Sequence, residues 1–133
     1  MKKNNKSFLL FILMIIFVIS VTGCSLGISS SQINPPSWII GTWSESTDTL
    51  DFEFSNDDII QESVGIKIDY KEALESDSLS ISKETSTDSK YSITMSDSSD
   101  TSTLSFEKVS DTKLNYSVSS SGVTVGPIEL TKE

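Results

Sequence analysis

The sequence LDFEF, residues 50–54, places a large apolar side chain at every second position and an acid at each position between. This period of two puts the leucine and both phenylalanines on one face of a β-strand and the two acids on the other. Such a strand packs one face against a core and exposes the other to water, as is common in antiparallel sheets. The stretch therefore predicts an amphipathic strand early in a β domain.

Shorter runs with the same alternation follow along the chain, and clusters of Ser, Thr, Asn, Asp and Gly separate them. Strand and turn recur about every 8 to 12 residues, which is typical of all-β barrels and sandwiches. We predict an all-β domain, a small antiparallel up-and-down β-barrel, with a β-sandwich as the alternative. The apolar members of the runs are Leu79 and Ile81; Tyr91, Ile93 and Met95; Leu104 and Phe106; Leu114, Tyr116 and Val118; Val123 and Val125; Ile128 and Leu130.

Two segments depart from this alternation. Asp69 can cap a short helix near residues 69–76, with Glu72 at the position that a capping box uses. The competing interpretation is that residues 66–70 continue a strand. Gly126-Pro127 interrupts the last apolar stretch, and we expect a bulge or bend there because proline has no N–H to donate to a ladder.

A Gly-x-Trp motif, Gly41 and Trp43, precedes the strand at 50–54. Followed by all-β hairpins, it resembles the N-terminal signature of lipocalin-like barrels. The resemblance implies that Gly41 lets the chain turn tightly into the first strand and that Trp43 plugs the closed end of the barrel. Lipocalins commonly pack an Arg over this Trp, but the chain contains no Arg. Lys108 or Lys132 would have to replace it as a point charge.

The domain is shorter than a full lipocalin, and an eight-stranded barrel is only wide enough for side chains or one small ligand. Phe52, Phe54, Phe106 and Tyr116 are the large aromatic candidates for the interior. They either line a ligand cavity or fill the core, and the sequence leaves both interpretations open.

The N-terminus has the composition of an export signal, with three lysines within its first six residues and an apolar run at 8–19. That run is shorter than the roughly 20 residues needed to span a hydrocarbon core. The tetrapeptide Val21-Thr22-Gly23-Cys24 after it resembles the lipobox of bacterial lipoproteins. The resemblance implies that Cys24 carries a diacylglycerol thioether, that cleavage occurs before it and that the new amine is often acylated.

These features divide the chain into three parts. Residues 1–23 are expected to be a lipoprotein signal peptide, 24–34 the lipidated cysteine with a flexible Ser-rich tether, and 35–133 the lipocalin-like domain. The resemblance places the protein in the bacterial cell envelope, lipid-anchored on the extracytoplasmic side of a membrane. Two or three acyl chains give a stable anchor, since each buried methylene contributes about 0.8 kcal/mol.

The chain is acidic, with 10 basic and 19 acidic residues and a net charge of -9. Residues 1–23 hold three lysines and no acid, so the remaining 7 lysines and 19 acids give the mature part -12. Such a surface repels phosphate backbones and anionic headgroups, which argues against nucleic acid binding. The acyl anchor must then supply membrane attachment. The acidic surface either serves solubility without a specific partner or attracts a cationic protein.

Catalytic side-chain types are scarce. The sequence has no His and a single Cys, which removes imidazole acid–base chemistry and the usual thiolate or imidazole metal sites. Asp57-Asp58 lacks the alternating oxygen ligands and the glycine of a calcium loop, and solvated turn acids are the favoured interpretation. We expect no catalytic residue, no metal and no cofactor.

The expected function is that of a membrane-anchored, monomeric lipoprotein that displays a lipocalin-like domain and binds a small apolar or amphipathic ligand. The alternative is a surface lipoprotein with a solid core that binds or inhibits a cationic protein. An enzyme is not expected.

Overall fold

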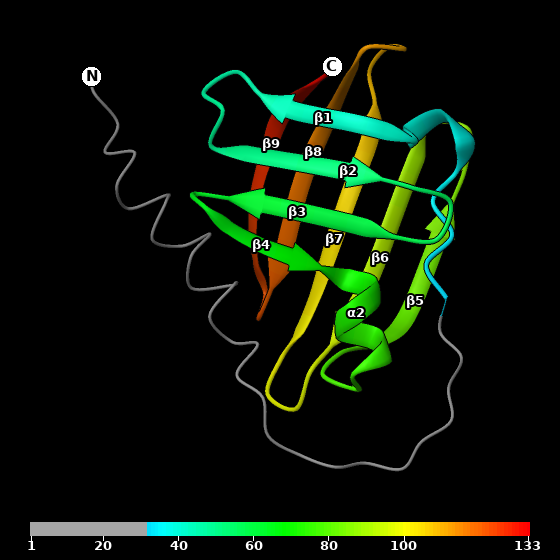
Figure 1. The fold of residues 1–133 in the computed structure, drawn as a ribbon, viewed down its shortest axis with the longest axis vertical. Coiled ribbons are helices and arrows are strands. Elements are labelled where there is room, and N and C mark those ends of the chain that lie inside the picture. Colours follow the sequence, from blue (N-terminus) through cyan, green and yellow to red (C-terminus); the bar gives the residue numbers. More distant parts are fainter. Residues whose placement is uncertain (1–31) are drawn as a thin grey trace.

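The strand expected from the LDFEF sequence is present as β2 (Leu50–Phe54), at the centre of a short antiparallel meander. The computed structural model of the chain describes residues 32–133. Figure 1 shows the order of the helices and strands along the chain. The other elements are η1 (Ser37–Ile39), β1 (Gly41–Glu45), β3 (Ile59–Ser63), β4 (Ile66–Asp69), α2 (Tyr70–Glu75), β5 (Ser80–Ser86), β6 (Lys90–Ser96), β7 (Thr101–Lys108), β8 (Lys113–Ser120) and β9 (Val123–Lys132).

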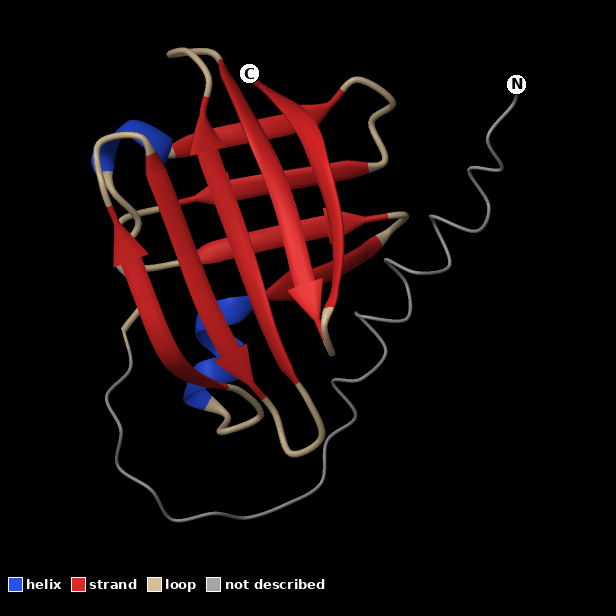
Figure 2. Ribbon diagram, turned by 180° about the vertical axis from the view of Figure 1, so that it is seen from behind, coloured by secondary structure: helices blue, strands red, loops and turns tan. Residues whose placement is uncertain are grey.

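All nine strands belong to one antiparallel sheet with the order β4-β3-β2-β1-β9-β8-β7-β6-β5. The first strand pairs with the last, with Trp43 opposite Lys132 and Ser44 opposite Thr131. The sheet curls so that β1–β4 form one layer and β5–β9 cross behind it (Figures 1 and 2). Because β1 and β9 join the layers, this is one curled half-barrel and not the two separate sheets of a sandwich. The predicted all-β, barrel-like fold is confirmed.

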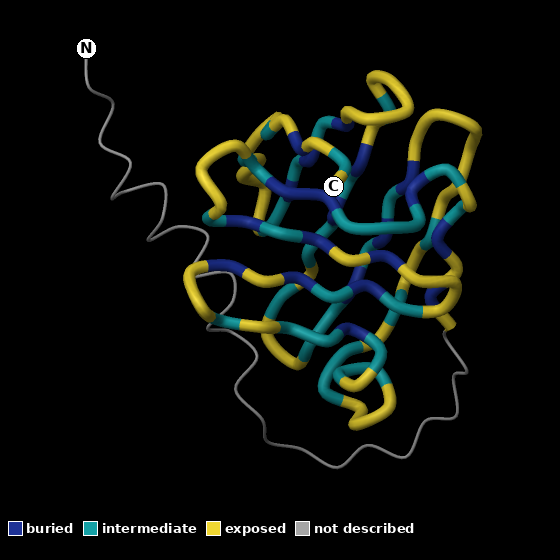
Figure 3. The backbone as a smooth tube through the Cα atoms, turned by 45° about the horizontal axis from the view of Figure 1, so that its top comes forward, coloured by how far each residue is buried: buried dark blue, intermediate teal, exposed yellow. Residues whose placement is uncertain are grey.

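The core lies between the two layers and takes every second side chain of most strands, as the alternating buried segments in Figure 3 show. It also extends upstream of the boundary expected at Pro35. Ile33 is only 1% exposed, and the Asn34 N–H donates to Glu84 Oε1 on β5 at 2.8 Å. The packed part of the chain therefore includes the last residues of the predicted tether.

The chain that connects the two layers contains both the strand and the helix that the sequence left as alternatives. Residues 66–69 form β4, and α2 begins at the next residue, Tyr70. Asp69 Oδ1 accepts from the Glu72 N–H at 2.8 Å, which is the expected N-cap. The helix lies near the opening between the edge strands β4 and β5, which do not pair with each other (Figure 1).

The expected irregularity at Gly126-Pro127 is also present. The register of β8 and β9 shifts between Tyr116 and Val118, opposite this dipeptide. Gly126 has a φ of 116°, and a Cβ there would lie 2.6 Å from the carbonyl oxygen of Tyr116. Both the backbone conformation and the close approach of β8 require glycine at this bulge.

Candidate functional site

The four lipobox residues, Val21, Thr22, Gly23 and Cys24, lie outside the described residues. Lipidation of Cys24 therefore stays a prediction from the sequence. Within residues 32–133, no helix is long and apolar enough to cross a membrane.

Gly41, Trp43 and Lys132 come together at one end of the half-barrel. Trp43 is fully buried, and its Nε1 donates to the Ile39 carbonyl at 2.7 Å. Lys132 Nζ lies 5.4 Å from the centroid of the Trp43 ring, a cation–π arrangement. Gly41 has a φ of 127°, and a Cβ there would meet Lys132 Cε at 3.0 Å. Of the two lysines considered from the sequence, Lys132 is thus the one that lies over the Trp43 ring, whereas Lys108 pairs with Asp111.

The aromatic residues expected in the interior pack against one another. Phe52, Phe54, Phe106 and Tyr116 are all buried. The Phe106 ring lies 5.1 Å from Phe52, 5.0 Å from Phe54 and 5.2 Å from Tyr116, measured between centroids. Phe52 and Tyr116 are 4.7 Å apart. Edge-to-face and stacked rings at these separations are in direct contact, so these four side chains act as core.

Two buried tyrosines use their hydroxyl groups as structural donors. Tyr70 on α2 donates to Gln61 Oε1 at 2.7 Å, and burial raises the pKa of Tyr70 above its ordinary value. Tyr91 donates to Glu84 Oε1 at 2.7 Å, and burial together with the neighbouring carboxylate raises its pKa. Both phenols stay protonated and serve as hydrogen-bond donors. Tyr70 links α2 to β3, and Tyr91 links β6 to β5.

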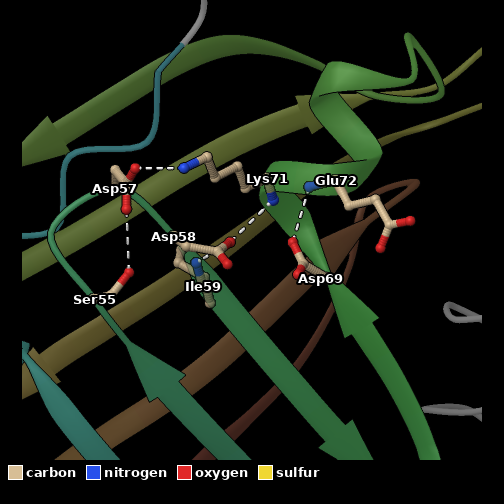
Figure 4. A network of polar contacts seen from close by, with 7 residues as sticks. All are labelled: Ser55, Asp57, Asp58, Ile59, Asp69, Lys71 and Glu72. Atoms are coloured by element: carbon tan, nitrogen blue, oxygen red, sulfur yellow. Dashed lines mark hydrogen bonds and ion pairs between the residues drawn. The ribbon is translucent and has the colours of Figure 1, made fainter.

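The turn acids before β3 fasten α2 to the sheet (Figure 4). Asp58 Oδ1 accepts from the N–H of Ile59 at 2.7 Å and from the N–H of Lys71 at 3.0 Å. Desolvation raises the pKa of Asp58 despite these donors. Asp57 pairs with Lys71 Nζ at 2.5 Å, and this hydrogen bond lowers the pKa of Asp57. Asp58 is therefore a helix-anchoring group rather than a simple solvated turn acid.

The outward side chains of β1–β4 form a strongly negative surface, here called the acidic face. Asp51 and Glu62 lie directly opposite each other in the ladder, a like-charge pair that disfavours pairing. The carboxylate of Glu133 joins this face, because Ser44 Oγ donates to it. The register places five acids and one lysine on the acidic face: Asp51, Glu53, Glu62, Asp69 and Glu133, with Lys67.

The outward side chains of β5–β9 form a different surface, here called the hydroxyl face. On β6, β7 and β8 its middle rows consist of Ser and Thr. Several hydroxyls pair across strands, including Thr94 with Thr103 at 2.9 Å and Ser119 with Thr124 at 2.8 Å. The charged side chains at its outward positions are three lysines and two acids: Lys83, Lys90, Lys113, Glu107 and Glu129. The acids of the described chain are thus distributed unevenly between the two faces.

In residues 32–133, no group of three His, Cys, Asp or Glu side chains is arranged to hold a metal ion. Within that part of the chain, the surface feature with a chemical bias is the contrast between the acidic face and the hydroxyl face. Sequence reasoning identified Gly41 and Trp43 but not Ile33, Asp58 or the charge contrast.

No family model matches the chain, and no curated protein matches it. Among solved structures, the crystal structure of pallilysin from Treponema pallidum is similar, with a TM-score of 0.52 and 10% sequence identity. The match covers 72% of this chain and 80% of that chain. At this identity the likeness shows a shared fold and no more.

Proposed function

We propose that the chain is a bacterial lipoprotein, anchored through Cys24 on the extracytoplasmic side of a membrane, that displays its half-barrel to bind a cationic protein. The observation that carries the binding role is the concentration of five acids on the outward face of β1–β4. A surface of one sign attracts a partner of the opposite sign and raises the rate of encounter. The absence of His and Arg from the sequence supports a binding role over a catalytic one.

The interior packing favours this proposal over a small apolar ligand inside the barrel. Phe52, Phe54, Phe106 and Tyr116 would have to line such a cavity, but their rings contact one another across the space between the layers. A core packed in this way leaves the outer surface and the loops as the places for recognition.

Cys24→Ser is expected to abolish lipidation and move the protein out of the membrane fraction, because serine has no thiol to receive the diacylglycerol. The measurement is metabolic labelling with a fatty acid, followed by detergent phase partition. Ser25→Ala, one residue further along the chain, is the matched control and should keep both label and partition. Unchanged labelling of Cys24→Ser would show that the tetrapeptide is not a lipobox.

Reversing two charges on the acidic face should weaken binding of a cationic probe. For Glu53→Lys with Glu62→Lys, we expect the affinity for polylysine to fall at least about tenfold at low salt, since like-charge juxtaposition costs several kcal/mol. Titration calorimetry at two salt concentrations measures this, and salt should weaken the wild-type binding.

The matched control is Glu107→Lys with Glu129→Lys on the hydroxyl face, which changes the net charge by the same amount. It should retain most of the affinity. An equal loss in both double variants would mean that net charge alone governs binding, and the acidic face would lose its assigned role.

A further inference from the structure

We propose that, when the chain is anchored, the hydroxyl face lies toward the anionic lipid surface and the acidic face points away from it. This inference rests on the proposed anchoring through Cys24 and adds an orientation to it. The occupant of the hydroxyl face is then the membrane itself, and the acidic face is left open to a soluble partner.

The place where the chain leaves the domain is the first argument. Ile33 is buried, and the Asn34 N–H donates to Glu84 on β5. Further along, Trp38 Nε1 donates to the carbonyl of Thr87, in the turn between β5 and β6, at 2.8 Å. These contacts hold residues 33–38 beside β5, the edge strand of the layer that carries the hydroxyl face (Figure 2). The upstream chain therefore leaves the domain at this edge.

The length of the upstream chain is the second argument. Residues 24–31 separate the lipid attachment point from the described domain. Fully extended, eight residues reach at most about 28 Å. A domain of this size is about 30 Å across, so the β5 edge must stay within roughly one domain diameter of the lipid. The anchor therefore keeps the edge that borders the hydroxyl face near the lipid, and charge decides which of the two faces turns toward it.

Charge is the third argument. The acidic face would bring five acids against one lysine to the headgroups, whereas the hydroxyl face brings two acids against three lysines. Lys83 and Lys90 are both exposed and belong to β5 and β6, next to the edge where the chain leaves. Asp88, in the turn after β5, and Glu107, opposite Lys90, lie at one end of this face, whereas Lys83 lies nearer its middle, opposite Thr94.

The difference between the faces is large enough to orient the domain. A lysine near an anionic surface changes the ratio of two orientations by about fivefold. The effect falls off within a Debye length of the membrane. The hydroxyl groups of Ser and Thr can also donate to lipid phosphate oxygens. Repulsion of the acidic face and weak attraction of the hydroxyl face act in the same direction.

The test is an amine-acetylation footprint of the full lipidated chain, read by mass spectrometry. The chain is reconstituted in vesicles of phosphatidylcholine alone or with phosphatidylglycerol. We expect acetylation of Lys83 and Lys90 to slow about fivefold on the anionic vesicles, while Lys67, on the acidic face, reacts equally in both. Lys83→Glu with Lys90→Glu should reduce protection of Lys113 on the same face, and Lys67→Glu should leave it unchanged.

The outcomes separate the orientation from the anchor. Failure of the protein to float with either vesicle would overturn the anchoring proposal and the orientation with it. Flotation with protection of Lys67, or with equal acetylation of all lysines, would overturn the orientation and leave the anchor intact. Protection of Lys83 and Lys90 in detergent without vesicles, growing with protein concentration, would assign the hydroxyl face to contact between copies instead.

Discussion

Trp43→Ala is expected to lower the free energy of unfolding by about 3 to 5 kcal/mol, the range for removing a buried aromatic side chain. Trp43 has no exposed surface, donates to the Ile39 carbonyl and lies beneath the Lys132 ammonium group. The substitution leaves a cavity, an unpaired carbonyl and a cation without its ring. Chemical denaturation followed by circular dichroism measures the loss.

Trp38 supplies the matched control. It is half-buried and donates to Thr87 from the surface, so Trp38→Ala should cost much less than Trp43→Ala. In a Trp38→Phe background, Trp43 is the sole tryptophan. Iodide should barely quench its fluorescence when it is excited selectively over tyrosine. Free quenching in the native protein would show that Trp43 does not plug the end of the half-barrel.

Phe106→Ala is also expected to lower the free energy of unfolding by about 3 to 5 kcal/mol. Phe106 is on β7, in the back layer, and its ring contacts Phe52 and Phe54 of the front layer. It therefore joins the two layers through the middle of the core. Removing the ring deletes several aromatic contacts at once, and the remaining rings cannot close the gap without moving the strands.

Denaturation of Phe106→Leu and Val109→Ala provides the comparison. Leucine fills part of the volume and should cost less than alanine, whereas Val109 is exposed and its truncation should be nearly neutral. A loss below about 1 kcal/mol for Phe106→Ala would be far under the range for buried aromatics. It would indicate a hollow interior and revive the small-ligand alternative.

The period-two runs predicted most of the sheet because their apolar residues face one core. β3 (Ile59–Ser63) was not among them, and its side chains explain why. Gln61 and Ser63 point inward and Ile60 points outward, so the alternation of polarity is reversed at three positions. Gln61 is tolerated in the core because Tyr70 donates to it. That partner comes from α2 and is visible only once the helix is placed.

Which of Lys108 and Lys132 lies over the Trp43 ring likewise could not be predicted without the fold. Both lysines end a strand, and the sequence gives no reason to prefer either. The pairing of β1 with β9 places Lys132 opposite Trp43 and decides the matter. The alternation along each strand also indicates which acids face outward, but it does not indicate which strands share a layer. The contrast between the acidic face and the hydroxyl face therefore could not be predicted.

The pairing of β1 with β9 also has a consequence for the order of folding. Trp43 and Lys132 lie near opposite ends of the described chain, so this contact closes a loop that contains almost the whole domain. Contacts of such high sequence separation form late, because the entropy of closing the loop must be overcome first. Until the last strand is available, the two halves of the sheet have no backbone ladder between them. A nascent chain therefore cannot close its sheet until its C-terminal residues have emerged from the ribosome.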